Sequence, residues 1–317
     1  MRLFWGPIDR FPQSGGKQVT FTNQQKEALL AVTTDRHQLH KILARVKTNK
    51  NALRNNEKTY YDEDKDRQSR TAYYQCIDFA DPDTLRKLEN LLEQTHTNPV
   101  RYDPGEYVYP WVDLRPDGDL KSIYSGEKRE VEDVIREDYE TSIKRKQVLE
   151  QVSGKGAAKA QLIQIASQLK FNCEHTVPQS WYDAKEPMRG DIHQLFTCDP
   201  LCNSIRSNYP YHDFENYNPG SIDTERIEES CGKAENELFE PEYAKGTVAR
   251  AMLYFLLRYP DKIEPAYRKK IDVALLYDWH SNFPPTIYER HRNEAIQGIQ
   301  GNRNPYIDFP EEMMKFS

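Results

Sequence analysis

The sequence predicts an α+β protein that is mostly helical, with a small strand–strand–helix unit near its centre. Three observations support this fold class. Apolar residues recur at helical spacing on both sides of the middle of the chain. Residues 171–215 differ in composition and are dense in Cys, His, Asn, Pro and aromatic residues. The 317 residues include 12 Phe, 20 Tyr and 4 Trp, which are enough large side chains to form a core.

The pattern divides the chain into an N-terminal helical region, residues 1–98, and a larger domain, residues 99–317, whose central unit spans about 171–215. In the first half we expect a helix from Thr22 or Asn23 to about Val46, a solvated charged stretch at 60–70 and a helix after Asp81-Pro82. A packed loop at 98–119 should follow, with a turn at Pro116–Gly118. Beyond it we expect a strand at Leu120–Tyr124 and helices at about 127–152 and 157–169. Cys76 is expected to be an ordinary buried thiol.

The central unit begins with a short strand that ends at Glu174 and His175. A turn at Arg189–Asp191 leads into a second strand, Ile192–Phe196, which would pair antiparallel with the first. A helix starting at about Pro200–Cys202 follows. Beyond a loop to about residue 240, we expect three helices at about 244–258, 264–280 and 285–298.

Charge and hydropathy exclude several classes of protein. With 44 basic and 50 acidic residues the formal charge is -6, so nucleic acid could be attracted only by a local basic patch or by a bound metal. No apolar run approaches the ~20 residues of a membrane span. The N-terminus lacks the apolar stretch of a signal peptide. We therefore expect a cytoplasmic protein as numbered, or a secreted one if a leader has been removed.

Two oxygen-bearing residues of the central unit suit a hard metal ion. Adjacent residues on a strand point to opposite faces, so one of Glu174 and His175 can bind a metal while the other faces a substrate. The following helix carries Asn203 and Arg206 on one face. A strand carboxylate and a helix amide oxygen, completed by waters and phosphate oxygens, favour Mg²⁺ or Mn²⁺. By contrast, we expect His193, Trp181 and Phe196 to be structural.

Four of the five cysteines, Cys173, Cys198, Cys202 and Cys231, flank this unit. In a reducing cytosol four thiols favour a structural Zn²⁺ site. Two disulfides become the better interpretation if the protein is exported, and unlinked buried thiols are the third alternative.

The central unit resembles the bacterial endonuclease I family of non-specific nucleases, which belongs to the ββα-metal (His-Me finger) superfamily. The resemblance is carried by CEHTVPQSW (173–181), MRGDIHQLF (188–196) and CNSIRSN (202–208). It extends to WVDLRPDGDLKSIYSG (111–126), CGKAENELFEP (231–241), KGTVARAMLYFLLRYP (245–260) and RNEAIQGIQGNRNPYIDFP (292–310). It covers roughly residues 100–310 and implies a ββα-metal finger as the catalytic core.

The resemblance also implies roles for individual residues. His175 matches the general base, and Glu174 and Asn203 match the ligands of a catalytic Mg²⁺. The insertion that carries a phosphate-stabilising Arg in periplasmic members is absent here, so Arg206 is preferred for that role by position, with Arg189 as the alternative. Asn208 matches a family Asn that fixes the helix or orients the base. A basic patch of Lys185, Arg189 and Arg206 would contact nucleic acid.

The implied reaction is one-metal hydrolysis of phosphodiester bonds in DNA, with RNA left open, to give 5′-phosphate ends. The imidazole of His175 must be neutral to act, so we expect activity to fall below its ordinary pKa of ~6.5. Two alternatives are a nucleic-acid-binding module that does not cleave, and a nuclease effector controlled by a protein regulator that binds residues 1–98.

Overall fold

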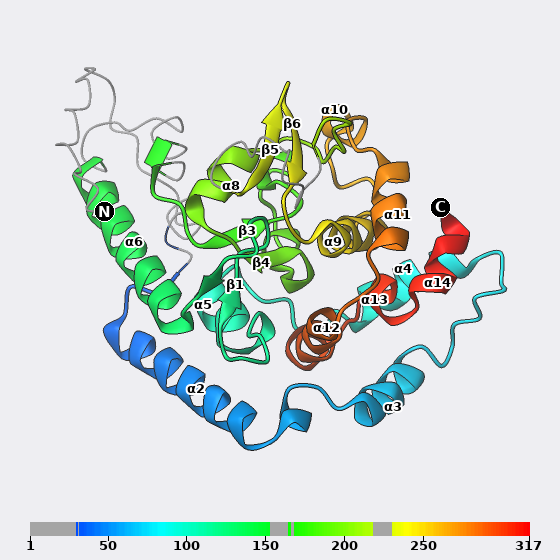
Figure 1. The fold of residues 1–317 in the computed structure, drawn as a ribbon, viewed down its shortest axis with the longest axis horizontal. Coiled ribbons are helices and arrows are strands. Elements are labelled where there is room, and N and C mark those ends of the chain that lie inside the picture. The colour runs from blue at the N-terminus through cyan, green and yellow to red at the C-terminus, as the bar shows by residue number, and fades with distance from the viewer. Residues whose placement is uncertain (1–29, 31, 153–163, 166–167, 218–229) are drawn as a thin grey trace.

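The computed structural model describes residues 30, 32–152, 164–165, 168–217 and 230–317. This part of the chain is mostly helical, with short antiparallel strand pairs among the helices, and it is therefore α+β (Figure 1). The longer helices are α2 (Arg36–Asn55), α3 (Glu63–Tyr73), α4 (Thr84–Thr95), α6 (Val131–Val152), α8 (Pro200–Arg206), α9 (Lys245–Arg258), α11 (Val273–Asn282) and α12 (Ile287–Gln300). The short helices are α5 (Pro104–Tyr107), α10 (Pro265–Arg268), α13 (Pro305–Asp308) and α14 (Pro310–Met313).

The strands form three antiparallel pairs in the described residues. They are β1 (Leu120–Lys121) with β2 (Lys128–Arg129), β3 (Cys173–His175) with β4 (Leu195–Thr197), and β5 (Gly232–Glu235) with β6 (Leu238–Pro241). Single turns of 3₁₀-helix or π-helix are η1 (Glu57–Thr59), η2 (Val108–Val112), η3 (Gln179–Trp181), η4 (Met188–Gly190), η5 (Ile192–Gln194) and η6 (Met314–Phe316).

The β3–β4 pair lies between two hydrophobic clusters near the middle of the molecule (Figure 1). Neighbouring residues on a strand face opposite ways, and accordingly Phe196 packs in one cluster while Leu195 packs in the other. The register pairs Glu174 with Phe196 and His175 with Leu195. Burial on both faces fixes this register, because a slip by one residue would exchange every side chain between the clusters.

Helix α12 holds β4 from outside the hairpin. The buried guanidinium of Arg292 donates hydrogen bonds to the carbonyl oxygens of Ile192 and Leu195, at 3.0 and 2.8 Å. It also forms an ion pair with Asp113, whose carboxylate accepts a hydrogen bond from the hydroxyl of Thr197 at 2.7 Å. Side chains far apart in the sequence therefore fix the strand that faces β3.

The helices before residue 98 pack into the same hydrophobic clusters as the rest of the chain. Leu88 of α4 belongs to the cluster that contains Trp181. The carboxylate of Asp66 in α3 is buried and lies 2.7 Å from the guanidinium of Arg303. The charged stretch at 60–70 is thus not simply a solvated face as expected, because the Arg303 ion pair requires one of its carboxylates inside.

Several predicted elements are confirmed. The helix after Pro82 forms as α4, the turn ends at Gly118 with φ of +86°, and α6, α8, α9 and α12 occupy their expected regions. Trp181 and Phe196 are buried in the core. Asp199 begins α8 by accepting a hydrogen bond from the backbone N–H of Leu201 at 2.8 Å.

Other predictions of the elements were wrong in detail. The first predicted helix begins later than expected, because residues 32–35 are not helical and Asp35 caps α2, which then continues beyond Val46 to Asn55. Thr22 and Asn23, the predicted start, lie outside the described residues. Most of 157–169 also lies outside them. The loop at 98–119 contains α5 and η2, the helix at 264–280 is divided into α10 and α11, and the loop before residue 240 contains β5 and β6. The sequence did not predict these short elements because they contain too few residues to show a full period of apolar positions.

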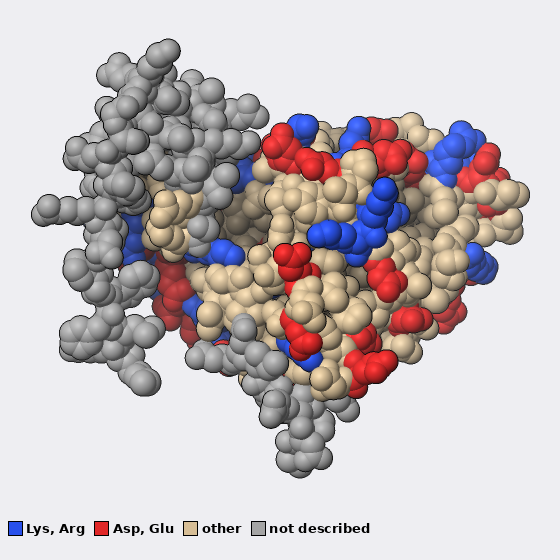
Figure 2. Space-filling model, turned by 90° about the horizontal axis from the view of Figure 1, so that it is seen from above, with Lys and Arg blue, Asp and Glu red and all other residues tan. Residues whose placement is uncertain are grey.

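Acidic and basic side chains are interspersed over the described part of the face that Figure 2 shows. No described helix combines the length and apolar character that crossing a bilayer requires.

Candidate active site

Strand β3, the η4 turn and helix α8 bring most of the predicted site residues to one cleft of about 260 Å³. The lining includes the predicted residues Glu174, His175, Arg189, Asn203, Arg206 and Asn208. The side-chain amide of Asn203 donates a hydrogen bond to the carbonyl oxygen of Cys173 at 3.0 Å, which ties α8 to β3. Lys185 is exposed and does not line the cleft.

The ring of His175 is held in one orientation. Its Nε2 lies 3.0 Å from the carbonyl oxygen of Arg189, and its Nδ1 lies 3.2 Å from the side-chain nitrogen of Gln179. A carbonyl oxygen can only accept, so Nε2 donates and Nδ1 keeps its lone pair. The ring of Tyr102 packs against the imidazole with centroids 4.7 Å apart. The neutral ring therefore presents a basic nitrogen beside the amide of Gln179.

Burial lowers the pKa of His175 to about 3, and the nearby Arg189 guanidinium acts in the same direction. The imidazole is consequently neutral at pH 7. This corrects the expectation that protonation near pH ~6.5 would silence the base, because that value holds for a solvated histidine.

Glu174 points to the other face of β3 and is buried in a polar network. Its Oε1 accepts a hydrogen bond from the hydroxyl of Tyr124 at 2.8 Å and lies 3.3 Å from Nε of Arg206. The Tyr124 hydroxyl lies 2.9 Å from that of Tyr211. Burial raises the pKa of Glu174, whereas Arg206 and Tyr124 oppose the rise.

Arg206 occupies a different position from the one expected of a phosphate-binding residue. Its side chain is completely buried, and one guanidinium nitrogen donates to the carbonyl oxygen of Thr176 at 2.7 Å. Another guanidinium nitrogen donates to the carbonyl oxygen of Ser207 at 3.2 Å, and the group also contacts Glu174 and the rings of Trp181 and Tyr211. The guanidinium is thus engaged with the protein interior and neutralises the Glu174 carboxylate.

The predicted basic patch of Lys185, Arg189 and Arg206 does not form. Arg189 keeps 12% of its side chain exposed at the cleft, with Nε 2.8 Å from Oε1 of Gln179 and the guanidinium over the ring of Tyr102. Lys185 lies 3.9 Å from the carboxylate of Asp183 on an exposed turn. Asn208 is exposed just beyond α8 and lines the cleft without a described hydrogen bond.

The cleft is nevertheless basic, through two residues that sequence reasoning missed. Arg145 of α6 and Lys170 line it together with Arg189 and Arg206, whereas Glu174 is the acidic residue in the lining. Lys170 precedes the motif by a few residues and could have been noticed. Arg145 lies in a helix of mixed charge, and nothing in its sequence context distinguishes it. Tyr102 and Gln179 were missed as well.

The cysteines differ from the expected four-thiolate zinc site. Cys202 and Cys231 form a disulfide with Cα atoms 5.0 Å apart, while Cys173 and Cys198 are buried free thiols. Two of the four sulfurs are thus oxidised and are no thiolate ligands in this structure. Of the two disulfides considered as an alternative, one forms and the other does not. Cys76, expected to be buried, is an exposed free thiol.

Comparison with known proteins identifies the class. The family model described as Endonuclease I matches residues 83–311, and the chain belongs to this family. An extracellular deoxyribonuclease of Aeromonas hydrophila is 28% identical over 159 residues, 44% of this chain and 65% of that protein. An extracellular ribonuclease of Bacillus subtilis is 33% identical over 161 residues, 44% of this chain and 52% of that protein.

An Endonuclease-1 of Buchnera aphidicola is also similar, with 30% identity over 120 residues, 37% of this chain and 45% of that protein. The matched regions span between 45% and 65% of the length of these three relatives.

Proposed function

We propose that this protein is a metal-dependent endonuclease that hydrolyses phosphodiester bonds in nucleic acid without sequence preference. The observation that carries the proposal is the juxtaposition of a neutral, oriented His175 and a cleft whose lining includes Arg145, Lys170 and Arg189 besides the internally paired Arg206, in a member of the endonuclease I family. A polyanionic backbone is the ligand that this charge would attract on a chain whose net charge is -6.

His175 acts as the general base. Its Nδ1 accepts a proton from a water molecule whose oxygen attacks phosphorus, the bond from phosphorus to the 3′ oxygen breaks, and the leaving 3′ oxygen takes a proton from solvent water. The products carry a 5′-phosphate and a 3′-hydroxyl. The Arg189 carbonyl keeps Nε2 as the donor, so the basic nitrogen is always Nδ1. Gln179 lies between the ring and the Arg189 guanidinium and orients both.

Glu174 and Asn203 would hold the catalytic cation. One carboxylate and one amide oxygen are donors that suit Mg²⁺ or Mn²⁺, with waters and phosphate oxygens completing the coordination. When bound, the cation would stabilise the additional negative charge on the phosphate. Together with the strand pair β3–β4 and helix α8, this donor set supports the assignment of a ββα-metal finger.

The arginines divide into two roles. Arg189 lies at the cleft surface and is the better candidate for contact with the phosphate, in place of Arg206. Arg206 positions Glu174 by neutralising it. Asn208 at the rim would contact the backbone of the nucleic acid. We retain no role in substrate binding for Lys185, because it lies outside the lining.

The relatives' names include both a deoxyribonuclease and a ribonuclease, so both nucleic acids are candidate substrates. Their extracellular names, together with the Cys202–Cys231 disulfide, support an oxidising compartment for this protein. A structural Zn²⁺ is no longer part of the proposal.

Incubation of purified protein with supercoiled plasmid and with RNA, in Mg²⁺ and in EDTA, tests the proposed function. We expect nicked and linear plasmid, or shortened RNA, in Mg²⁺ and intact substrate in EDTA. End-labelling should find 5′-phosphates. Tight binding of both substrates without cleavage in Mg²⁺ or Mn²⁺ would favour the non-cleaving module instead.

A further inference from the structure

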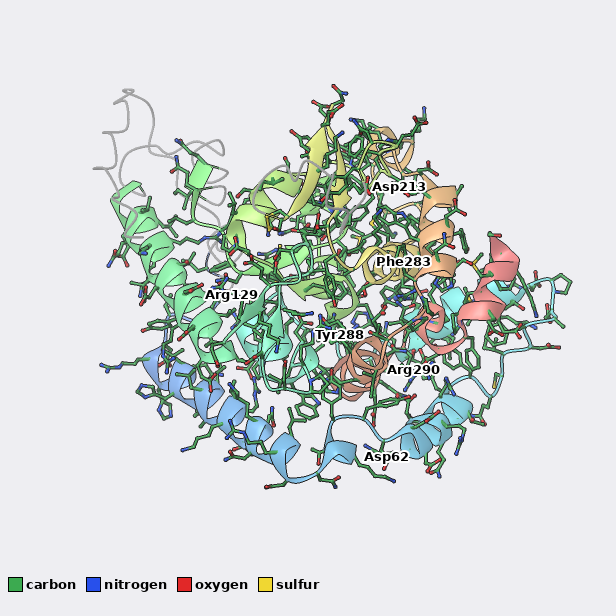
Figure 3. The ribbon with its side chains drawn as sticks, viewed as in Figure 1. Asp62, Arg129, Asp213, Phe283, Tyr288 and Arg290 are labelled. Carbon is green, nitrogen blue, oxygen red and sulfur yellow. A yellow bond between two sulfur atoms is a disulfide. The ribbon has the colours of Figure 1, made fainter. Side chains whose placement is uncertain are left out.

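A second cavity, of about 440 Å³, lies where the start of α9 meets the segment between α11 and α12. Phe283 directly follows α11 and Tyr288 belongs to the first turn of α12, so the two mark this junction (Figure 3). None of its lining residues lines the catalytic cleft. Its volume falls within the range of small-molecule sites, roughly 300–1,000 Å³.

Arg115 lines this cavity, and its side chain has no polar partner among the residues that the structure describes. Its guanidinium lies 3.3 Å from the centroid of the Tyr288 ring, and its buried Nε has no hydrogen-bond partner among the described residues. The hydroxyl of Tyr288 is anchored by Asp113 at 3.1 Å, which fixes the ring beneath the guanidinium. Arg115 therefore contributes a positive charge that no described carboxylate neutralises.

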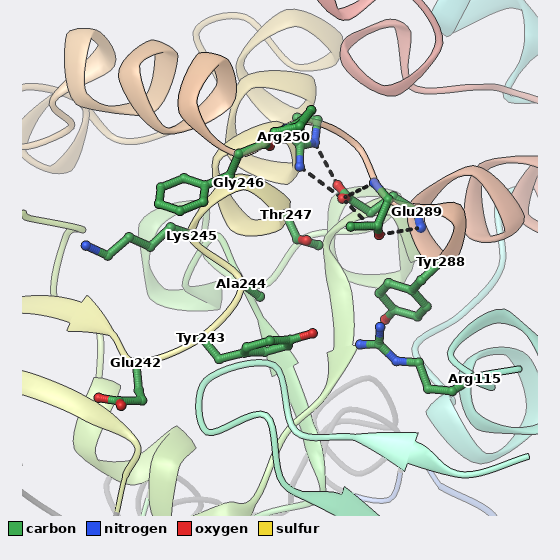
Figure 4. Close-up of a pocket in the computed structure, with 13 residues that line it drawn as sticks. Arg115, Glu242, Tyr243, Ala244, Lys245, Gly246, Thr247, Arg250, Tyr288 and Glu289 are labelled. Atoms are coloured by element: carbon green, nitrogen blue, oxygen red, sulfur yellow. Dashed lines mark hydrogen bonds and ion pairs between the residues drawn. The ribbon is translucent and has the colours of Figure 1, made fainter. Parts of the chain in front are cut away.

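The two other basic side chains of the lining are already compensated, and the carboxylate of Glu242, which also lines the cavity, accepts a hydrogen bond from the Tyr217 hydroxyl and lies on the far side of Tyr243 from Arg115 (Figure 4). The guanidinium of Arg250 lies 2.7 Å from the Glu289 carboxylate, and these two side chains meet at one end of the cavity (Figure 4). The ammonium of Lys245 lies 2.6 Å from Glu240 and points away from Arg115 (Figure 4). An anion entering here would meet Arg115.

Exposed apolar side chains gather at the same place. Tyr243 and Phe283 line the cavity with 36% and 46% of their surface exposed, and Ile287, 54% exposed, is adjacent to the lining residues. The ammonium of Lys121 lies 4.8 Å from the centroid of the Tyr243 ring and adds a second cation beside it. The other two exposed large hydrophobic residues of the described chain, Leu85 and Leu201, lie elsewhere. Exposed aromatic rings beside an arginine form a surface on which a nucleobase can stack.

The start of α9 adds hydrogen-bond donors to the wall. Ala244 precedes the helix with φ of +62° and offers no side-chain cap. The N–H groups of the first helical turn have no partners within the helix. Lys245, Gly246 and Thr247, which supply them, line the cavity. These donors supplement the Arg115 charge.

We propose that this cavity binds a nucleotide unit, with the base stacked on Tyr243 and the phosphate held by Arg115. Stacking accounts for the exposed rings, and the phosphate accounts for the unneutralised guanidinium. A purely apolar ligand would cover the charge of the half-buried Arg115 without giving it a partner. The inference takes its ligand class from the proposed nuclease function but does not require His175 to cleave anything.

Calorimetric titration with thymidine 5′-monophosphate, which an endonuclease cannot cleave, tests this site directly. We expect binding that Arg115→Gln weakens by about tenfold or more, because a hydrogen-bonded charge is lost. Tyr243→Ala should weaken it by a similar factor through lost stacking. The exposed Arg268 lies outside the lining, and its Arg268→Gln variant is the matched control expected to bind normally. Thermal unfolding of each variant checks that the fold is intact.

Further titrations identify the source of the nucleotide. Thymidine and inorganic phosphate should each bind more weakly than the monophosphate. Hexathymidylate, with and without a 5′-phosphate, is titrated into His175→Ala protein, and gel analysis shows whether it stays intact. Tighter binding of the phosphorylated form would assign the site to strand ends, and equal binding would assign it to internal nucleotides.

Three results would overturn the nucleotide site. These are monophosphate binding unchanged by both Arg115→Gln and Tyr243→Ala, binding lost only with Arg189→Gln in the catalytic cleft, and inorganic phosphate binding as tightly as the monophosphate. Cleavage of hexathymidylate by His175→Ala protein would count against the proposed catalytic base and leave the monophosphate result standing.

Discussion

The ammonium group of Lys170 lies 3.0 Å from the backbone oxygen and 3.2 Å from the side-chain oxygen Oδ1 of Asn203. The amide oxygen assigned to the metal is therefore hydrogen-bonded to a cation carried by the chain itself. Burial lowers the pKa of Lys170, while the charge of Glu174 opposes that shift, so the ammonium also faces the second proposed ligand. A divalent ion and Lys170 would compete for the same oxygens.

Replacing Lys170 by Met should raise the affinity for divalent cations. Removing a like charge from the metal site favours binding, and we expect the dissociation constant for Mn²⁺ to fall about tenfold or more. Titration followed by electron paramagnetic resonance measures free Mn²⁺ without any turnover. Lys144→Met, on an exposed position of α6, is the control. Weaker Mn²⁺ binding in Lys170→Met would show that the lysine supports the site rather than competing.

His175→Ala should abolish most cleavage while the protein stays folded. Loss of a general base typically costs ~10²–10⁴-fold in rate. The rate of plasmid nicking at saturating Mg²⁺ measures the effect, with near-ultraviolet circular dichroism as the test of folding. Gln179→Ala should reduce the rate less, because it removes a contact to Nδ1 but leaves the Arg189 carbonyl in place. A His175→Ala protein that nicks at the wild-type rate would exclude this base.

Arg206→Met and Arg189→Met should separate stability from activity. Loss of Arg206 leaves the buried Glu174 carboxylate without its cation, which should cost about 3–5 kcal/mol of unfolding free energy. Urea denaturation measures this loss, and adding Glu174→Gln should recover part of it. Arg189→Met should instead lower the cleavage rate with a smaller effect on stability. The assignment fails if Arg206→Met unfolds at the wild-type urea concentration.

The buried histidines should make the protein less stable in acid. Burial lowers the pKa of His193 from 6.5 to about 4, although Asp191 opposes the shift. Between these values the unfolded chain binds a proton that the folded chain does not, so stability is lost as pH falls. For this one group the loss is about 2–3 kcal/mol at pH ~4.5. Urea unfolding at pH 7.5 and ~4.5 measures it, and His193→Gln should show a shallower pH dependence. Equal pH dependence in the variant and the wild type would contradict the prediction.

The disulfide should stabilise the fold, and zinc should not. Cys202 and Cys231 are 29 residues apart in sequence, and closing a loop of that size is worth about 3–4 kcal/mol in the chain-entropy model. Cys202→Ala combined with Cys231→Ala should lower the melting temperature in non-reducing buffer, whereas Cys76→Ala at an exposed position should not. A zinc chelator should leave the melting temperature unchanged, and a marked drop would restore the zinc hypothesis.

The sequence by itself determined the chemistry-bearing segment. Glu174 and His175 were placed at the end of a strand and Asn203 on the following helix, because strand alternation and helix spacing are local properties of the chain. The family motifs lie in the same segment, and the family match over residues 83–311 confirmed the resemblance. The long amphipathic helices were equally readable, since their apolar periodicity extends over several turns.

Only the tertiary structure decided which charged groups meet. Arg206 looked like a phosphate ligand beside the motif, yet it is buried against Glu174. Arg145 and Lys170 reach the cleft from other segments, and Cys202 pairs with Cys231 across 29 positions. Burial and pairing depend on what the rest of the chain packs against each side chain, and they set the pKa of His175 as well. Local sequence fixes the direction in which a side chain points, but the solvent exposure and neighbours that determine its chemistry come from the folded whole.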